Sequence, residues 1–318
     1  MEKFKLISYH VFFGNINGLI LENIYNQRKR NEYLTFVKKE KINYIFPQDN
    51  DMSLLTIFQG IEYLTIPEDA ENIESLYALS SLRGIEICAD HLTNLSLEKF
   101  SNLEFLSIIG HPKDINVIKF KDHIKRLYCN NWNYENLENL FGFNNLESLM
   151  IDGCRRLKSL KGLVSLKHLE NLRAIYCLKL VNIEALKYIK GSLKTLEIMQ
   201  CNKVSSFSVV AELNLLQDLV LISGTSMPPK ILNSVSFISN LKELKTFVTD
   251  YTIMDFDLTP LLKLEHAELI KYHNQYNLKD EDLPKKYVIV KTPKGLQTKF
   301  LKELEGGKNN ANIIWGDK

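Results

Sequence analysis

One pattern occurs three times in the middle of the chain: Leu146-Glu-Ser-Leu149-Met-Ile151-Asp-Gly-Cys154-Arg-Arg-Leu157, Leu169-Glu-Asn-Leu172-Arg-Ala174-Ile-Tyr-Cys177-Leu-Lys-Leu180 and Leu193-Lys-Thr-Leu196-Glu-Ile198-Met-Gln-Cys201-Asn-Lys-Val204. Apolar residues fill its first, fourth and sixth positions, a cysteine fills the ninth, and an aliphatic residue fills the twelfth. Alternating apolar positions predict a short strand with one buried face. Recurrence at a nearly fixed spacing predicts a repeat architecture.

The same pattern extends in both directions from this stretch. Written as L-x-x-L-x-L-x-x-C-x-x-L, it resembles the leucine-rich-repeat family. About ten candidate repeats follow one another, with first positions at Ile61, Leu82, Leu103, Ile124, Leu146, Leu169, Leu193, Leu216, Leu241 and Leu264.

The resemblance implies an α/β fold, a curved leucine-rich-repeat solenoid. Parallel β-strands would line its concave wall, and mixed 3-10, α-helical and extended segments would form its convex side. Helix-compatible convex stretches occur at 134–140, 182–190 and 229–238. In this family the ninth-position residue points inward and satisfies backbone groups of neighbouring turns, a role that Cys154, Cys177 and Cys201 would take.

Atypical sequence at both ends predicts caps, because a solenoid must hide its terminal apolar layers from water. We expect an N-terminal cap over 1–58, with a hairpin or a strand and helix around the glycine-rich turn and one degenerate repeat at 42–47. About ten repeats are expected over 59–280 and a C-terminal cap over 281–318. Trp315 is predicted to plug the end of the core.

The composition indicates a folded protein without a bulk electrostatic partner. The chain is 45% hydrophobic and 25% charged, with a net charge of +2, which is too small to imply nucleic acid or a membrane. It shows no secretory signal at its start and no long apolar run. The five cysteines contain no C-x-x-C pair, so we expect reduced thiols and a cytoplasmic protein.

Motifs for catalysis are missing from the sequence. It contains no G-x-S-x-G, H-E-x-x-H, P-loop or G-x-G-x-x-G pattern, and no two histidines have the i, i+4 spacing of a metal pair. Cys88 is expected to face outward from its strand, but its neighbours Pro67 and Ile109 would not activate a thiol. We therefore expect no enzyme activity, no cofactor and no metal.

The concave wall, formed by the third, fifth, seventh and eighth repeat positions, is the candidate binding surface. Large apolar, aromatic and arginine side chains gather in its middle, and such residues are enriched in protein interfaces. For the isoleucines of the seventh position, packing against the following loop is the simpler explanation. The predicted partner-binding residues are Phe105, Arg126, Tyr128, Met150, Asp152, Arg173, Tyr176, Glu197 and Met199.

These observations favour a non-enzymatic module that captures one protein on its concave face, for example as an inhibitor or immunity-type protein. The alternative is a structural adaptor that joins two partners. A mildly acidic wall disfavours a nucleic-acid partner. The free chain is expected to be a monomer.

Overall fold

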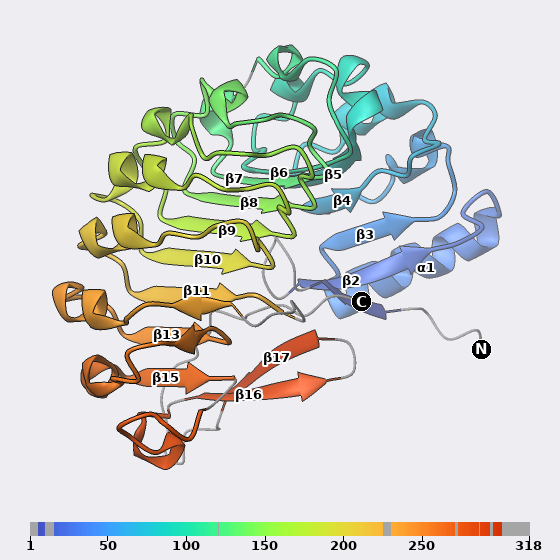
Figure 1. Cartoon of the computed structure of the whole chain (residues 1–318). Helices are drawn as coiled ribbons and strands as arrows, with labels where there is room; N and C mark the ends of the chain where they lie inside the picture. The colour runs from blue at the N-terminus through green and yellow to red at the C-terminus, as the bar shows by residue number, and fades with distance from the viewer. Residues whose placement is uncertain are drawn as a thin grey trace.

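The fold is a curved coil of strands with short helices on its outer rim, seen in a computed structural model that describes residues 6–9, 16–119, 121–224, 230–270, 273–285, 287–292 and 295–300 (Figure 1). One 13-stranded sheet runs through it in the order β1-β2-β3-β4-β5-β6-β7-β8-β9-β10-β11-β13-β15. Its strands are β1 (Leu6–Tyr9), β2 (Ile16–Leu21), β3 (Tyr44–Pro47), β4 (Tyr63–Thr65), β5 (Gly84–Cys88), β6 (Phe105–Ile109), β7 (Arg126–Asn130), β8 (Ser148–Asp152), β9 (Asn171–Ile175), β10 (Thr195–Met199), β11 (Asp218–Ile222), β13 (Thr246–Thr249) and β15 (His266–Leu269).

Strand pairing follows the repeat. β1 and β2 form an antiparallel hairpin, and every later pair in this sheet is parallel and in register, so that Leu149 on β8 lies opposite Leu172 on β9. The β1–β2 hairpin and β3 lie in the segment for which an N-terminal cap and one degenerate repeat at 42–47 were predicted. Among the described residues, no helix is long and apolar enough to cross a membrane.

The core lies on one face of the sheet, between the strands and the outer segments. Fourth- and sixth-position side chains such as Leu149 and Ile151 are fully buried there. Because strand side chains alternate faces, the third, fifth and seventh positions point to the other side of the sheet. The solenoid predicted from the repeat pattern is therefore confirmed.

The ninth-position cysteines form the predicted inner ladder. The Cys154 thiol contacts the carbonyl oxygen of Cys129 at 3.7 Å, and the Cys177 thiol contacts that of Ile151 at 3.8 Å. The Cys201 thiol contacts that of Ala174 at 3.4 Å. Each buried thiol thus links its own turn to the preceding repeat.

The outer segments differ from the prediction in helix type. The 3-10 helices are Met52–Leu55, Ile73–Ala78, Ala89–Thr93, Leu97–Lys99, Ile115–Val117, Lys121–His123, Glu138–Leu140, Leu163–Ser165, Glu184–Ile189, Ser208–Glu212, Ser236–Asn240, Thr259–Lys263 and Asp280–Asp282. Within the described ranges, the only α-helix is α1 (Gln27–Glu40), outside the repeats. The helix-compatible stretches at 134–140, 182–190 and 229–238 are too short between their buried leucines for α-helical turns, and the tighter 3-10 turn suits them.

One repeat was predicted in the wrong register. The pattern predicts Leu241 as a first position, which would make Leu244 the fourth, but Phe247 on β13 pairs with Leu219 and is the fully buried fourth-position residue. Lys245 therefore lies before the strand, and Thr246 and Val248 face the concave side. The shift arises because the preceding segment is longer and contains β12 (Ile231–Leu232), which pairs with β14 (Thr252–Ile253) on its own.

The two ends of the solenoid carry different elements. Helix α1 is capped by the Asn26 side chain, which accepts a hydrogen bond from the Lys29 amide, and it buries Tyr33 and Val37 in the core. After β15 the chain forms the antiparallel hairpin of β16 (Tyr287–Thr292) and β17 (Gly295–Phe300). Trp315, predicted to plug the core, lies outside the described residues.

Candidate functional site

A second apolar cluster covers the concave side of the sheet, separate from the core. We call the concave side chains of β3 to β15 the wall. Its buried apolar members are Tyr44, Tyr63, Phe105, Tyr128, Met150, Ile175, Met199, Val220, Ile222 and Val248. A sheet face that only meets water would carry polar residues at these positions, so the wall is the candidate contact surface.

Polar groups in the middle of the wall are tied to one another. The Tyr128 hydroxyl donates to Asp152 Oδ2 at 2.9 Å, and the Asn130 amide donates to the Tyr128 hydroxyl oxygen at 3.2 Å. Burial and the neighbouring Asp152 charge raise the pKa of Tyr128 well above its usual value. Tyr128 therefore stays neutral and presents a ring held in a fixed orientation.

One ion pair is set into the apolar surface. Arg173 Nε lies 3.2 Å from Glu197 Oε1 across β9 and β10. The second oxygen of Glu197 is buried and has no hydrogen-bond partner in the described structure. Burial raises the pKa of Glu197, while Arg173 lowers it. A buried carboxylate oxygen without a donor is unfavourable, so this site has an unused acceptor at the centre of the wall.

Aromatic and cationic groups stack at the N-terminal part of the wall. Tyr63 and Phe105 stack with ring centroids 5.7 Å apart, and the Arg126 guanidinium lies 4.8 Å from the Phe105 ring centroid. Below them Glu86 accepts hydrogen bonds from Thr65 and Ser107 at 3.2 and 3.0 Å. These contacts hold the Phe105 ring against its neighbours.

The turn after each middle strand uses a left-handed backbone. Eighth-position residues after β6 to β10 have positive φ, and two of them, Gly110 and Gly153, are glycines. Tyr176 also occupies this conformation, with φ 52°, and its hydroxyl accepts a hydrogen bond from Gln200 at 3.0 Å. A tyrosine rarely adopts this region, and such strain is concentrated at functional positions.

The structure brings the predicted binding residues onto five adjacent strands and the turn after β9. Phe105, Tyr128, Met150, Glu197 and Met199 are buried, whereas Arg126, Asp152, Arg173 and Tyr176 are half-buried. Whether they bind a partner stays a prediction. The apolar wall also continues beyond them to both sides, through residues such as Tyr44 and Val220 that lie outside the predicted cluster of aromatic and arginine side chains.

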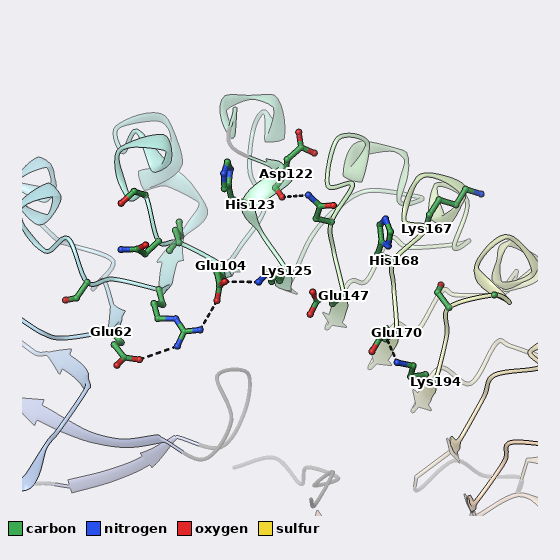
Figure 2. A pocket seen from close by; sticks show the side chains of 18 of the residues that line it. Glu62, Glu104, Asp122, His123, Lys125, Glu147, Lys167, His168, Glu170 and Lys194 are labelled. Carbon is green, nitrogen blue, oxygen red and sulfur yellow. Dashed lines mark hydrogen bonds and ion pairs between the residues drawn. The ribbon is translucent and has the colours of Figure 1, made fainter.

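A polar groove runs along the flank where successive loops lead into their strands. It has a volume of about 1410 Å³ and extends from Gly60 to Leu215. Figure 2 shows acidic and basic side chains along it, among them Glu104, Lys125, Glu170 and Lys194. Arg83 Nη2 lies 2.8 Å from Glu104 Oε2, and Lys125 Nζ lies 2.9 Å from Glu104 Oε1.

The charged side chains of the groove form ion pairs mainly with one another. The hydrogen bonds from Lys125 and Arg83 lower the pKa of Glu104, and Lys194 pairs with Glu170 at 2.6 Å. Exposed pairs of this kind contribute about 0–1 kcal/mol each. The sequence carries a signal for these pairs, the opposite signs of second-position residues such as Arg83, Glu104 and Lys125, but the predicted site used only the wall positions.

The described residues hold no group of three or more metal-ligating side chains. Cys88 faces outward and is half-buried, as predicted, and burial followed by the charge of Glu68 raises its pKa. That shift disfavours a reactive thiolate.

Comparisons with known proteins show the fold. No family model and no curated protein matches the chain. Among solved structures, TLR13 in its complex with ssRNA13 is 16% identical, with a TM-score of 0.52 over 76% of this chain and 40% of that one. An internalin, InlF from Listeria monocytogenes, is 20% identical, with a TM-score of 0.43 over 71% of this chain and 74% of that one. A leucine-rich-repeat protein from Leptospira interrogans is 14% identical, with a TM-score of 0.39 over 79% and 77%.

Proposed function

We propose that this leucine-rich-repeat solenoid captures a protein partner on its wall and acts by binding rather than by catalysis. The observation that carries the proposal is the apolar cluster on the concave side, separate from the core and interrupted by one ion pair. Interfaces combine an apolar centre with aromatic and arginine anchors in this way. Residues Tyr128, Arg173 and Tyr176 are the proposed anchors.

The size and charge of the wall favour a protein over a nucleic acid. Strands spaced about 4.8 Å apart give the repeats a length of roughly 40–50 Å, which matches an interface of about 20–30 residues on each side. Glu86, Asp152, Glu197 and Asp218 face this side, and they would repel phosphates. TLR13 forms a complex with an RNA, but this acidic wall does not suit such a ligand.

Capture without catalysis suits an inhibitor or immunity-type role. We place such a protein in a reducing compartment such as the cytoplasm, because its cysteines are unpaired thiols. The free chain would be a monomer. A scaffold that joins two partners is the second candidate, and the flank groove, a separate large surface, is the observation that favours it.

Alanine substitution tests the proposal. In Tyr128→Ala, Arg173→Ala and Tyr176→Ala, partner binding should weaken by about 2 kcal/mol or more for each true anchor. Tyr188→Ala is the matched control, because Tyr188 is an exposed aromatic side chain on a convex 3-10 helix.

The partner would be isolated by affinity capture with the full chain, and the variants compared by calorimetry and thermal unfolding. If all three wall variants bind the partner with unchanged affinity, the binding site lies on another surface of the solenoid. Capture of a single enzyme in a one-to-one complex, with loss of its activity on binding, would support the inhibitor role. Two partners bound at once, one of them insensitive to the wall variants, would support the scaffold.

A further inference from the structure

Two buried carboxylates occupy the same repeat position on the wall but differ in their hydrogen bonding. Glu86 on β5 is 7% exposed, and Glu197 on β10 is 2% exposed. One oxygen of Glu86 accepts a hydrogen bond from Thr65 at 3.2 Å, and the other accepts one from Ser107 at 3.0 Å. Thr65 and Ser107 are the in-register residues of the two neighbouring strands, so the sheet itself satisfies this carboxylate.

The corresponding neighbours of Glu197 satisfy only one of its oxygens. Strands β9, β10 and β11 lie side by side in the sheet (Figure 1). On β9, Arg173 Nε lies 3.2 Å from Glu197 Oε1. On β11, the in-register residue is Val220, whose side chain has no hydrogen-bond donor. Glu197 Oε2 is a buried acceptor without a hydrogen-bond partner among the described residues, and such an acceptor is unfavourable until a donor reaches it.

The charges around this acceptor favour a positively charged donor. The guanidinium of Arg173 is paired with the other oxygen of Glu197. On β11, Asp218 adds a second negative charge that acts on Glu197. Diagonal neighbours on adjacent strands lie about 7–8 Å apart, so a cation bound at Glu197 would interact with both carboxylates. It would offset the repulsion between them, which a neutral donor cannot do.

The burial of the acceptor favours a long side chain that carries its charge at the tip. Met199 and Val220, on the same face as Glu197, belong to the apolar cluster of the wall. Lysine and arginine lay their methylene stems along apolar surface and present the charged group at the end. A metal ion is less suited, because the described residues contain no group of three or more metal-ligating side chains.

We propose that the protein partner inserts an arginine or lysine side chain between β10 and β11, where it donates a hydrogen bond to Glu197 Oε2. The inference rests on the proposed function, because it names the chemistry by which a protein on the wall is recognised. The cation adds to the Arg173–Glu197 pair and does not replace it. A partner with an apolar side chain at this point leaves the acceptor unpaired, so the position is selective.

A display library of random peptides, selected on the full wild-type chain, is the probe for this inference. The peptides kept for study would be those that lose affinity in Tyr128→Ala, because these bind the wall. Their sequences should be enriched in arginine and lysine relative to the unselected library. In individual peptides each basic residue would be replaced by methionine, which keeps an unbranched stem and removes the charge.

A double-mutant cycle assigns the contact to Glu197. On the wild-type chain, replacing the decisive basic residue by methionine should weaken binding about tenfold or more. On Glu197→Gln the same replacement should weaken binding about twofold or less, because the charge pair is already lost. Glu86→Gln is the matched control, since both oxygens of Glu86 are already hydrogen-bonded, and there the tenfold effect should persist. Equal losses on the wild-type chain and on Glu197→Gln would overturn the proposal.

A measurement on the wild-type chain covers the case in which Glu197→Gln does not fold. Burial raises the pKa of Glu197, and a cation at Oε2 should lower it, because a positive charge favours the ionised carboxylate. NMR titration of the carboxyl carbon should therefore give a lower pKa for Glu197 with the basic peptide than with its methionine form. The same pKa with both peptides would contradict the proposal.

The selection also separates this inference from the proposed function. Peptides that depend on the wall but need no basic residue would overturn the inference and leave the proposed function intact. If no selected peptide depends on the wall, the proposed function fails and the inference fails with it.

Discussion

The two faces of strands β7 to β10 are built from the same short segments but follow different rules. On the core face the residues are nearly interchangeable: Leu127, Leu149, Leu172 and Leu196 repeat one side chain, and the cysteine ladder repeats one contact. On the wall, the equivalent position in four successive repeats holds four chemically different side chains: Tyr128, Met150, Arg173 and Glu197. The core face satisfies the requirements of stacking, whereas variety on the wall is what selective binding requires.

Substitution of adjacent residues on β8 should separate the two faces. Leu149→Ala should reduce the free energy of unfolding by about 3 kcal/mol, because it leaves a cavity in a closely packed core. Met150→Ala, one residue away on the wall, should cost about 1–2 kcal/mol, because the space it leaves lies among the side chains of the wall and outside the main core. Chemical denaturation measures both, and equal losses would show that the wall is packed as tightly as the core.

Acidification should destabilise the chain through a wall residue near its C-terminal end. Burial and the nearby Lys285 charge lower the pKa of His266 to about 4. Because the unfolded chain takes up the proton near pH 6.5, stability is complete above that pH and falls as the pH drops toward 4. At pH 5 the loss should be about 2 kcal/mol.

His266→Asn is the control for this effect, since asparagine has no charge to gain. Denaturation at pH 7.5 and pH 5.0 should show a much smaller loss in the variant than in the wild type. The same loss in both proteins would assign the acid sensitivity to other groups.

On the core face, Cys177→Ser should reduce the free energy of unfolding by about 1 kcal/mol. The shorter C–O bond moves the donor away from the Ile151 carbonyl, which the thiol contacts at 3.8 Å. Cys88→Ser should change stability by less than about 0.5 kcal/mol, because Cys88 lies outside the ladder and is half-buried. Thermal unfolding compares the two variants. Equal shifts of their unfolding midpoints would show that the ladder thiol contributes no more to stability than Cys88 does.

The sequence predicted the core face better than the wall. Apolar periodicity located the strands because every fourth-position residue must be buried, whatever its partner. It failed at Leu241 because Leu244 also offers an apolar residue at the right spacing. The run Thr246-Phe247-Val248-Thr249 has the higher β propensity and could have indicated the true strand.

Burial of the wall could not be predicted in the same way. A column of side chains read from the repeat shows which residues point to the concave side, but not what lies above them. Exposure there depends on contacts between residues far apart in the sequence, which follow no period. The same limit applies to the flank groove, whose charges pair between neighbouring repeats.

Tyr176 gives the smallest expected change in stability and the sharpest separation of folding from binding. Asparagine tolerates a positive φ better than tyrosine does, and Asn131 already occupies the equivalent turn with φ 58°. In Tyr176→Asn, relief of strain should offset the lost hydrogen bond from Gln200, so that stability changes by less than about 1 kcal/mol. Binding should nevertheless weaken by about 2 kcal/mol, because an anchor ring is lost. If stability instead fell by the amount expected for a core residue, Tyr176 would belong to the stacking machinery, and its strained backbone would reflect packing rather than recognition.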